Sequence, residues 1–235
     1  MKHTLVAALA SYVLVSSDAQ AALLNSYDFD TLGRGDTLLV GDDLTDNGGT
    51  IAGGLYSFTD NQGLRLTAAL PDTSNYGIEL RFKVIDSIAG YNKLIDFQDL
   101  SSDFGLYLLE GTVDFFTALS TSGTVSLGEF VTVGLERSGG SISLFLDGAF
   151  LGTATDDSEQ AVSLGNILNF FVDDTQVAGE SFAGAVDFIR IHNDSSTFGQ
   201  APAMPAIPVP ASLPMLLSGL GLLSLLRRAG SRQRA

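Results

Sequence analysis

The chain has 235 residues, of which 27 are acidic and 12 are basic, and its formal net charge at pH 7 is −15. This excess of negative charge argues against binding to nucleic acid or to an anionic membrane surface. Because there are no cysteines, disulfide bonds are excluded, and we expect a large β core, alone or with a metal ion, to stabilise the fold.

The first 21 residues have the three parts of a secretory signal peptide. Residues 1–3 form a short basic segment, residues 5–15 are apolar, and Ala19 and Ala21 are the small residues that signal peptidase requires. An apolar run of this length is too short to span a membrane. We therefore expect cleavage after Ala21, with one folded domain formed by residues 22–195.

Residues 22–195 alternate short strand-like runs with turns rich in glycine, aspartate, asparagine and serine. The clearest run is residues 76–85, where apolar side chains alternate with charged ones at the period of a strand. Gly139-Gly140 and Asp147-Gly148 are typical of hairpin turns. Residues 30–53 are expected to form a long polar loop. The strands are expected at residues 23–29, 54–58, 63–67, 76–85, 94–97, 105–109, 112–119, 130–138, 141–146, 149–154, 167–172 and 182–192.

About a dozen strands with no convincing amphipathic helix predict an all-β fold, namely an antiparallel two-sheet sandwich of jelly-roll type. Residues 76–83 and 94–97 are similar to two early strands of a known family. Residues 142–148 match its strand-turn hairpin, and residues 184–191 match its closing strand, with His192 in place of a tyrosine. The domain therefore resembles the concanavalin A-like, laminin G-type jelly roll.

The segment from residue 169 to residue 180 predicts a calcium site. Calcium takes about six to eight oxygen ligands from clustered carboxylates and carbonyls. Asp173 and Asp174 follow a strand that is expected to end at Val172, and Glu180 can return to the same rim before the last strand. These three carboxylates are therefore candidate metal ligands, although solvated turns are the simpler interpretation of most acidic loops.

Asp187 is a fourth candidate ligand, because the resembled fold often binds calcium near its first and last strands. Strict alternation places Asp187 on the same face as Ile189 and Ile191. A carboxylate on an apolar face is unfavourable unless it is paired or bound to a metal. The alternatives are a salt bridge to Arg190 or Arg65, or simple exposure to solvent.

Catalysis is not expected, although many concanavalin A-like folds are glycosidases. A retaining glycosidase needs two carboxylates about 5–5.5 Å apart, and the Glu-x-Asp-x-x-Glu strand that would supply them is absent from the sequence. There is no cysteine nucleophile and no Gly-x-Ser-x-Gly motif.

The case for sugar recognition is weaker because the chain has no tryptophan. The aromatic side chains that remain as possible platforms for a sugar ring are Tyr56, Tyr76, Tyr91 and Tyr107.

Residues 207–235 have the three-part order of a surface-sorting signal. A proline-marked motif that includes Val209, Pro210, Ala211 and Ser212 is followed by an uncharged run, residues 211–226, and then by Arg227 and Arg228. As a helix the run is about 24 Å long, short of the roughly 30 Å hydrocarbon core. The arginines would stop transfer and stay on the cytoplasmic side.

This segment resembles the PEP-CTERM class of sorting signals, and more narrowly its VPLPA variant. The resemblance implies processing by an exosortase-type membrane protease of a Gram-negative bacterium, near the motif residues. Residues 196–206 are expected to be a linker. An ordinary tail anchor and a buried helix of the domain are the alternatives, and the lack of an amphipathic period argues against the buried helix.

Taken together, these patterns predict a noncatalytic exported module that binds carbohydrate or matrix. Exosortase-type systems usually accompany exopolysaccharide production, which makes exopolysaccharide the expected partner beside signal peptidase and the sorting protease. A purely structural envelope protein is the alternative, and a glycoside hydrolase is a less favoured one. We expect transient anchoring in the inner membrane, then a place on the cell surface or in the extracellular matrix, with Ca²⁺ as the candidate cofactor.

Overall fold

The computed structural model describes residues 23–29, 37–38 and 44–193. The predicted signal peptide, linker and sorting signal lie outside these residues, as do Ala19, Ala21, residues 209–212 and residues 227–228. Within the part of the chain that is described, no helix is long and apolar enough to cross a membrane.

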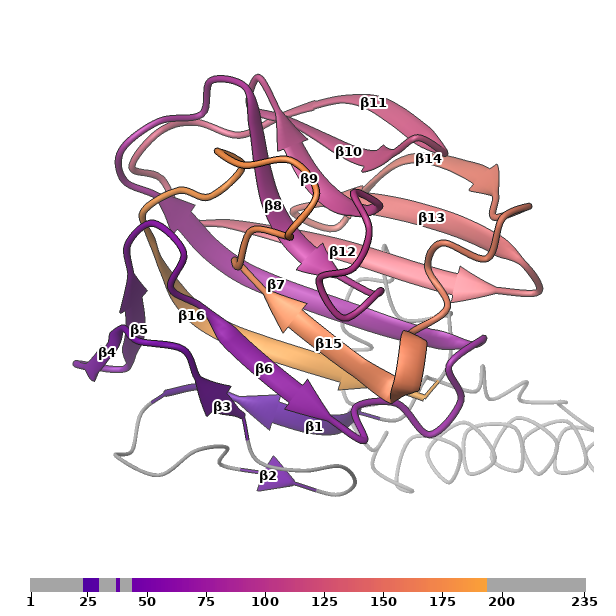
Figure 1. Ribbon diagram of the computed structural model, residues 1–235, viewed down its shortest axis with the longest axis horizontal. Coiled ribbons are helices and arrows are strands. Elements are labelled where there is room, and N and C mark those ends of the chain that lie inside the picture. Colours follow the sequence, from indigo (N-terminus) through magenta and orange to yellow (C-terminus); the bar gives the residue numbers. More distant parts are fainter. Residues whose placement is uncertain (1–22, 30–36, 39–43, 194–235) are drawn as a thin grey trace, which may run out of the picture. The chain divides into compact units, whose positions relative to one another are not determined.

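The described residues form two antiparallel sheets packed face to face (Figure 1). This confirms the predicted all-β, two-sheet sandwich. The nine-stranded sheet has the order β14-β13-β12-β7-β16-β1-β2, while β5 pairs with β16 and β4 pairs with β5. Its strands are β1 (Leu23–Tyr27), β2 (Thr37–Leu38), β4 (Thr50–Ala52), β5 (Leu55–Phe58), β7 (Tyr76–Val84), β12 (Val131–Ser138), β13 (Ser141–Leu146), β14 (Ala149–Thr155) and β16 (Gly184–His192).

The seven-stranded sheet has the order β11-β10-β9-β8-β15-β6-β3. A short 3-10 helix, η1 (Leu164–Asn166), precedes β15. The strands of this sheet are β3 (Thr45–Asp46), β6 (Leu64–Thr67), β8 (Tyr91–Asp96), β9 (Gly105–Leu109), β10 (Thr112–Phe116), β11 (Leu119–Thr124) and β15 (Ile167–Phe170).

The core lies between the sheets and is built by the period-two patterns of the strands. In β7 the side chains of Ile78, Leu80 and Phe82 are fully buried, while the charged side chains between them are partly exposed. Aromatic rings fill the centre: the ring centroids of Phe58 and Phe171 are 4.7 Å apart, and those of Phe58 and Phe182 are 5.3 Å apart. The predicted alternation in this strand is therefore confirmed.

Two local predictions were wrong. Residues 30–53 were expected to form one polar loop, yet they contain β2, β3 and β4, which have only two or three residues each and are too short to produce a period. Residues 112–119 were expected to form one strand, but a turn closed by a 2.7 Å hydrogen bond from Ala118 N to Phe115 O separates β10 from β11.

A β-bulge at Asp187 corrects the strict alternation expected for the last strand. Val186 pairs with Phe82 and Phe188 pairs with Arg81, so Asp187 is the extra residue between them. Its side chain is 42% exposed on the outer face of the nine-stranded sheet, and its Oδ2 lies 2.8 Å from Arg81 Nε. The salt bridge that was the alternative to metal binding therefore exists, but with Arg81 in place of Arg190 or Arg65, because the bulge shifts the register of the strand.

The outer face of the seven-stranded sheet is partly covered by the loop of residues 171–183, which crosses β8 and β9 in Figure 1. The loop is anchored at both ends by Phe171 and Phe182, which are buried in the core. Backbone hydrogen bonds join it to β8, from Phe171 N to Leu94 O at 3.1 Å and from Lys93 N to Glu180 O at 2.8 Å. Side chains that would face solvent on an open sheet are therefore buried beneath this loop.

Candidate functional site

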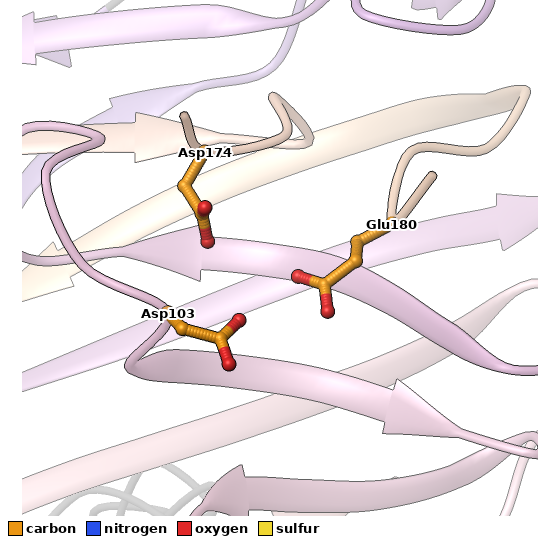
Figure 2. A group of neighbouring side chains, drawn as sticks. All are labelled: Asp103, Asp174 and Glu180. Carbon is orange, nitrogen blue, oxygen red and sulfur yellow. The ribbon is translucent and has the colours of Figure 1, made fainter. Parts of the chain in front are cut away.

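Three carboxylates from two loops point toward one another on this outer face (Figure 2). Asp103 comes from the loop of residues 97–104, while Asp174 and Glu180 come from the loop of residues 171–183. One ligand oxygen from each lies within 4.8 Å of the other two. Asp174 and Glu180 are buried and Asp103 is partly buried. We call these three residues the acidic cluster.

The structure therefore brings together two of the four predicted ligands and adds one that sequence reasoning missed. Asp103 lies two residues before β9, and nothing in its local pattern connects it with a loop far along the chain. Asp187 lies in the other sheet and pairs with Arg81, so it does not join the acidic cluster.

Asp173, the fourth predicted ligand, closes its own loop. Its Oδ2 accepts hydrogen bonds from the backbone N–H of Gly179 at 2.9 Å and of Glu180 at 3.1 Å. These bonds hold the two ends of the turn together. This carboxylate has a structural contact of its own, separate from the acidic cluster.

A buried lysine already supplies a positive charge at the acidic cluster. The side chain of Lys93 on β8 has no exposed surface, and its ammonium group contacts Oδ2 of Asp174. The same group lies 4.0 Å from Oδ2 of Asp96 and 4.9 Å from the centre of the Tyr107 ring. A buried ammonium ion is stable only when it is paired in this way.

Glu180, a member of the acidic cluster, has a raised pKa. Burial raises its pKa to about 7; the negative charges of Asp103 and Asp174 act in the same direction, and a hydrogen bond from Tyr107 opposes them. The Tyr107 hydroxyl donates that bond to Glu180 Oε2 over 2.9 Å. Burial also raises the pKa of Tyr107 well above its usual range, with Glu180 as a further cause.

The four predicted ligands do not come together as one calcium site. Of its four expected ligands, Asp187 belongs to the opposite sheet, Asp173 binds backbone amides, and Asp174 contacts an ammonium group.

The raised pKa of Glu180, next to a second carboxylate, is a property that a general acid in a glycosidase needs. Asp174 and Glu180 are buried, however, and neither lines the two clefts described next.

An open cleft of about 290 Å³ adjoins the covered region on the same sheet. We call it the Arg65 cleft. Arg65 on β6 is fixed there, because its Nη1 lies 2.5 Å from Asp99 Oδ1 and 3.2 Å from Asn169 Oδ1. Its hydrogen bond lowers the pKa of the Asp99 carboxyl. The lining residues are Thr45, Asp46, Asn47, Leu64, Arg65, Leu100, Asn169 and Val172.

One wall of the Arg65 cleft rests on the same loops as the acidic cluster. Leu100 is held by Thr175, whose backbone N–H and hydroxyl both donate to its carbonyl, at 3.2 and 2.9 Å. The amide of Leu100 in turn donates to Asp96 Oδ1 over 2.7 Å. Val172 immediately precedes Asp173. The shape of this wall therefore depends on how firmly residues 97–104 and 171–183 are fixed.

A second cleft, of about 280 Å³, lies beside the end of β14. Asp156 in its lining is held by Arg137, with Nε and Oδ2 2.8 Å apart and both side chains buried. Its lining residues are Thr117, Ala118, Ala154, Thr155, Asp156, Asp157, Ser158 and Gln160.

The tyrosines expected as sugar platforms are mostly interior residues. Tyr56, Tyr76 and Tyr107 are buried, and their hydroxyls donate to Gly63 O, Ala161 O and Glu180 Oε2 respectively. Of the four, Tyr91 alone is partly exposed.

Comparison with known proteins adds evidence on the fold. No protein-family model matches the chain, and no curated protein sequence matches it either. Among solved structures, it is similar to domain 4 of AbnA, a GH43 extracellular arabinanase from Geobacillus stearothermophilus, in complex with arabinotriose. The identity is 16%, the TM-score is 0.55, and the match covers 75% of this chain and 94% of that one.

Two further similar structures are larger. A mutant Trypanosoma rangeli sialidase displaying trans-sialidase activity has 13% identity, a TM-score of 0.59, and coverage of 74% of this chain and 31% of that one. The binding domain of botulinum neurotoxin serotype D has 11% identity, a TM-score of 0.51, and coverage of 74% and 48%. This chain thus spans less than half of either. At these identities the likeness concerns the fold, a β-sandwich that also occurs in carbohydrate-active proteins.

Proposed function

We propose that this chain is a noncatalytic, exported carbohydrate-binding module and that the Arg65 cleft is its glycan site. We further propose that the sandwich is of the concanavalin A-like, laminin G type. The observation that carries the proposal is the fixed guanidinium group of Arg65 in an open cleft. It is held by Asp99 and Asn169, 2.5 and 3.2 Å from its Nη1.

A glycan site needs a few positioned polar groups beside an apolar surface. Arginine has five N–H donors in a planar fork, and the two contacts above involve only one of its nitrogens. Asn47 and Asn169 add amide groups to the same lining, while Leu100 and Val172 supply apolar surface. The cleft therefore offers both hydrogen-bonding groups and an apolar side against which a sugar ring can pack.

The electrostatics favour a glycan without acidic groups. Asp99 already pairs with the guanidinium of Arg65, and Asp46 adds a further carboxylate to the lining. The formal net charge of −15 adds a long-range repulsion of polyanions. The AbnA domain is complexed with arabinotriose, an uncharged oligosaccharide. We propose a neutral exopolysaccharide as the ligand class.

The targeting segments support an extracellular role. We propose that signal peptidase removes residues 1–21, that an exosortase-type protease acts near residues 209–212, and that the domain then resides on the cell surface or in the matrix of a Gram-negative bacterium. The predicted inner-membrane stage depends on residues 211–226 and on the arginines that follow. Pulse-chase labelling with a Pro210→Ala variant tests this route, because the proposal expects the unprocessed form to accumulate.

The binding proposal is tested by co-sedimentation of the chain with the producer's own exopolysaccharide. Arg65→Ala should abolish pelleting. Arg190→Ala is the matched control, because both arginine side chains are 38% exposed and Arg190 lies on the opposite sheet. Failure of the wild-type chain to pellet would leave a structural envelope protein. Pelleting by Arg65→Ala would place the site elsewhere, and release of reducing sugar would indicate a glycoside hydrolase.

A further inference from the structure

We propose that the Lys93 ammonium group is the cation of the acidic cluster and takes the place of a divalent metal ion. Its consequence for function, which rests on the glycan site proposed above, is that binding at the Arg65 cleft needs no calcium. A lysine of the chain itself would then do what a bound ion does in a metal-stabilised loop, namely hold several carboxylates from different segments together.

The position of the ammonium group supports this role. It contacts Asp174, one of the three carboxylates whose oxygens approach within 4.8 Å of one another. It also lies 4.0 Å from Asp96, on its own strand. Both Lys93 and Asp174 have fully buried side chains, so solvent does not screen this interaction. A divalent ion bound by Asp174 would have to displace the ammonium group or lie next to it, and both are unfavourable in a buried site.

The charged and aromatic groups around the lysine come from two strands and the covering loop. Asp96 comes from β8, Asp174 and Glu180 come from the covering loop, and Tyr107 comes from β9. Asp103 reaches the same region from the loop before β9. One positive charge thus joins β8 to the covering loop, and Asp103 brings the loop of residues 97–104 to the same carboxylates.

Backbone contacts connect this charge to the cleft. The amide of Lys93 donates to the carbonyl of Glu180 over 2.8 Å, and Thr175, directly after Asp174, donates twice to the carbonyl of Leu100. Leu100 and Val172 then line the cleft. Lys93 is therefore a positioning residue, and it does not itself line the cleft.

The experiment compares thermal unfolding and calcium titration calorimetry of the full chain and its Lys93→Met variant, in excess calcium and in chelator. The wild-type Tm should be the same in both conditions, with no heat of calcium binding. Lys93→Met should have a lower Tm in chelator and regain part of the loss in calcium, because three carboxylates have lost their competing ammonium group. Lys83→Met, on the opposite sheet, should show no calcium response.

Several outcomes would overturn the inference. A rise in wild-type Tm with calcium that is lost in Asp174→Asn would mean that a metal ion replaces the ammonium group. A folded Lys93→Met variant without a calcium response would mean that the lysine is not the compensating charge. If Lys93→Met alone does not fold in chelator, the double variant Lys93→Met with Asp174→Asn replaces it, because both charges of the pair are removed. This double variant should fold, and its Tm should be the same with and without calcium. A Tm that rises with calcium in the double variant would contradict the inference.

Co-sedimentation separates this inference from the proposed function. If the wild-type chain pellets equally in calcium and in chelator, the result supports both the glycan site and the calcium independence of binding. Pelleting that is lost only in chelator overturns the calcium independence and leaves glycan binding standing. If there is no pelleting in either condition, the glycan proposal fails, while the Tm and calorimetric results still decide the role of Lys93.

Discussion

The ammonium group of Lys93 contacts the carboxylate of Asp174 although the two residues are 81 positions apart in the chain, and neither side chain is exposed to solvent. This pair fixes the loop of residues 171–183 onto the outer face of the seven-stranded sheet. By contrast, the pair of Arg81 and Asp187 on the opposite sheet is well exposed, with side-chain exposures of 37% and 42%. Both are ion pairs, but breaking the buried pair should lower the free energy of unfolding more than breaking the exposed one.

Asp174→Asn should therefore be strongly destabilising. Removing one partner of a buried ion pair leaves the other charge uncompensated and typically costs about 3–5 kcal/mol. Asp187→Asn breaks an exposed pair and should cost less than about 1 kcal/mol. Urea unfolding of both variants measures the difference, and equal losses would contradict the structural distinction.

The stability of the domain should depend on pH through Glu180. Its folded-state pKa of about 7 lies above its ordinary value of 4.5, so the folded state binds the proton more tightly than the unfolded state. The resulting stabilisation is complete below pH 4.5 and is lost as the pH rises through about 7. Unfolding free energies measured across this window should fall with rising pH.

Glu180→Gln should remove that part of the pH dependence. The amide oxygen can still accept the hydrogen bond that Tyr107 donates to Oε2, but glutamine does not titrate. Glu129→Gln, at an exposed position, should leave the pH profile unchanged. A Glu180→Gln profile that still matches the wild type between pH 4.5 and 7 would show that another group causes the slope.

Arg65→Ala should separate binding from stability. The ion pair with Asp99 is more than one third exposed on both sides, and such pairs contribute at most about 1 kcal/mol. The variant should therefore melt close to the wild type while losing glycan affinity. Parallel calorimetric melting and co-sedimentation measure the two effects, and a large fall in Tm would mean that the arginine supports the fold instead.

Gly63→Ala should disturb the edge of the Arg65 cleft by steric overlap. A Cβ atom at this position would lie 2.2 Å from the Phe170 carbonyl oxygen and 2.5 Å from Val172 Cγ2. Overpacking of this kind typically costs about 1–3 kcal/mol. Gly152→Ala in β14 is the matched control, because its Cβ would meet Leu119 at an ordinary 3.4 Å. Comparable stability of the two variants would contradict this close packing around Gly63.

The fold was largely predictable, because the residues next to one another in a strand determine which of its side chains face the core and which face solvent. The alternation in β7 and the hairpin turns after β12 and β13 depend on neighbouring residues, and the longer strands were found within a few residues of their bounds, while β2, β3, β4 and the separate β11 were missed. In the last strand the bounds were close, but the expected faces of the side chains were wrong. An extra residue at Asp187 shifts the register, and no local signal in the sequence marks such a bulge.

The candidate site was predictable only in part. The local pattern indicated that Asp174 and Glu180 return to one rim, and they do approach each other. Lys93 was not singled out, because β8 was expected to begin at Leu94 and in fact begins at Tyr91. Asn92 and Lys93 are polar, and polar residues at the end of an apolar run predict an exposed turn. Both are nevertheless buried in the strand, Lys93 because the loop of residues 171–183 covers it.

The sequence by itself determined the class of fold, the absence of disulfide bonds and the excess of negative charge, because these follow from composition and from period-two patterns. The tertiary structure alone decided which carboxylates meet, that a lysine is buried among them, and where the Arg65 cleft opens. The physical reason is burial. Whether a charged side chain faces water or another charge depends on the loop that covers it, and the covering loop of residues 171–183 is distant in sequence from the strand beneath it.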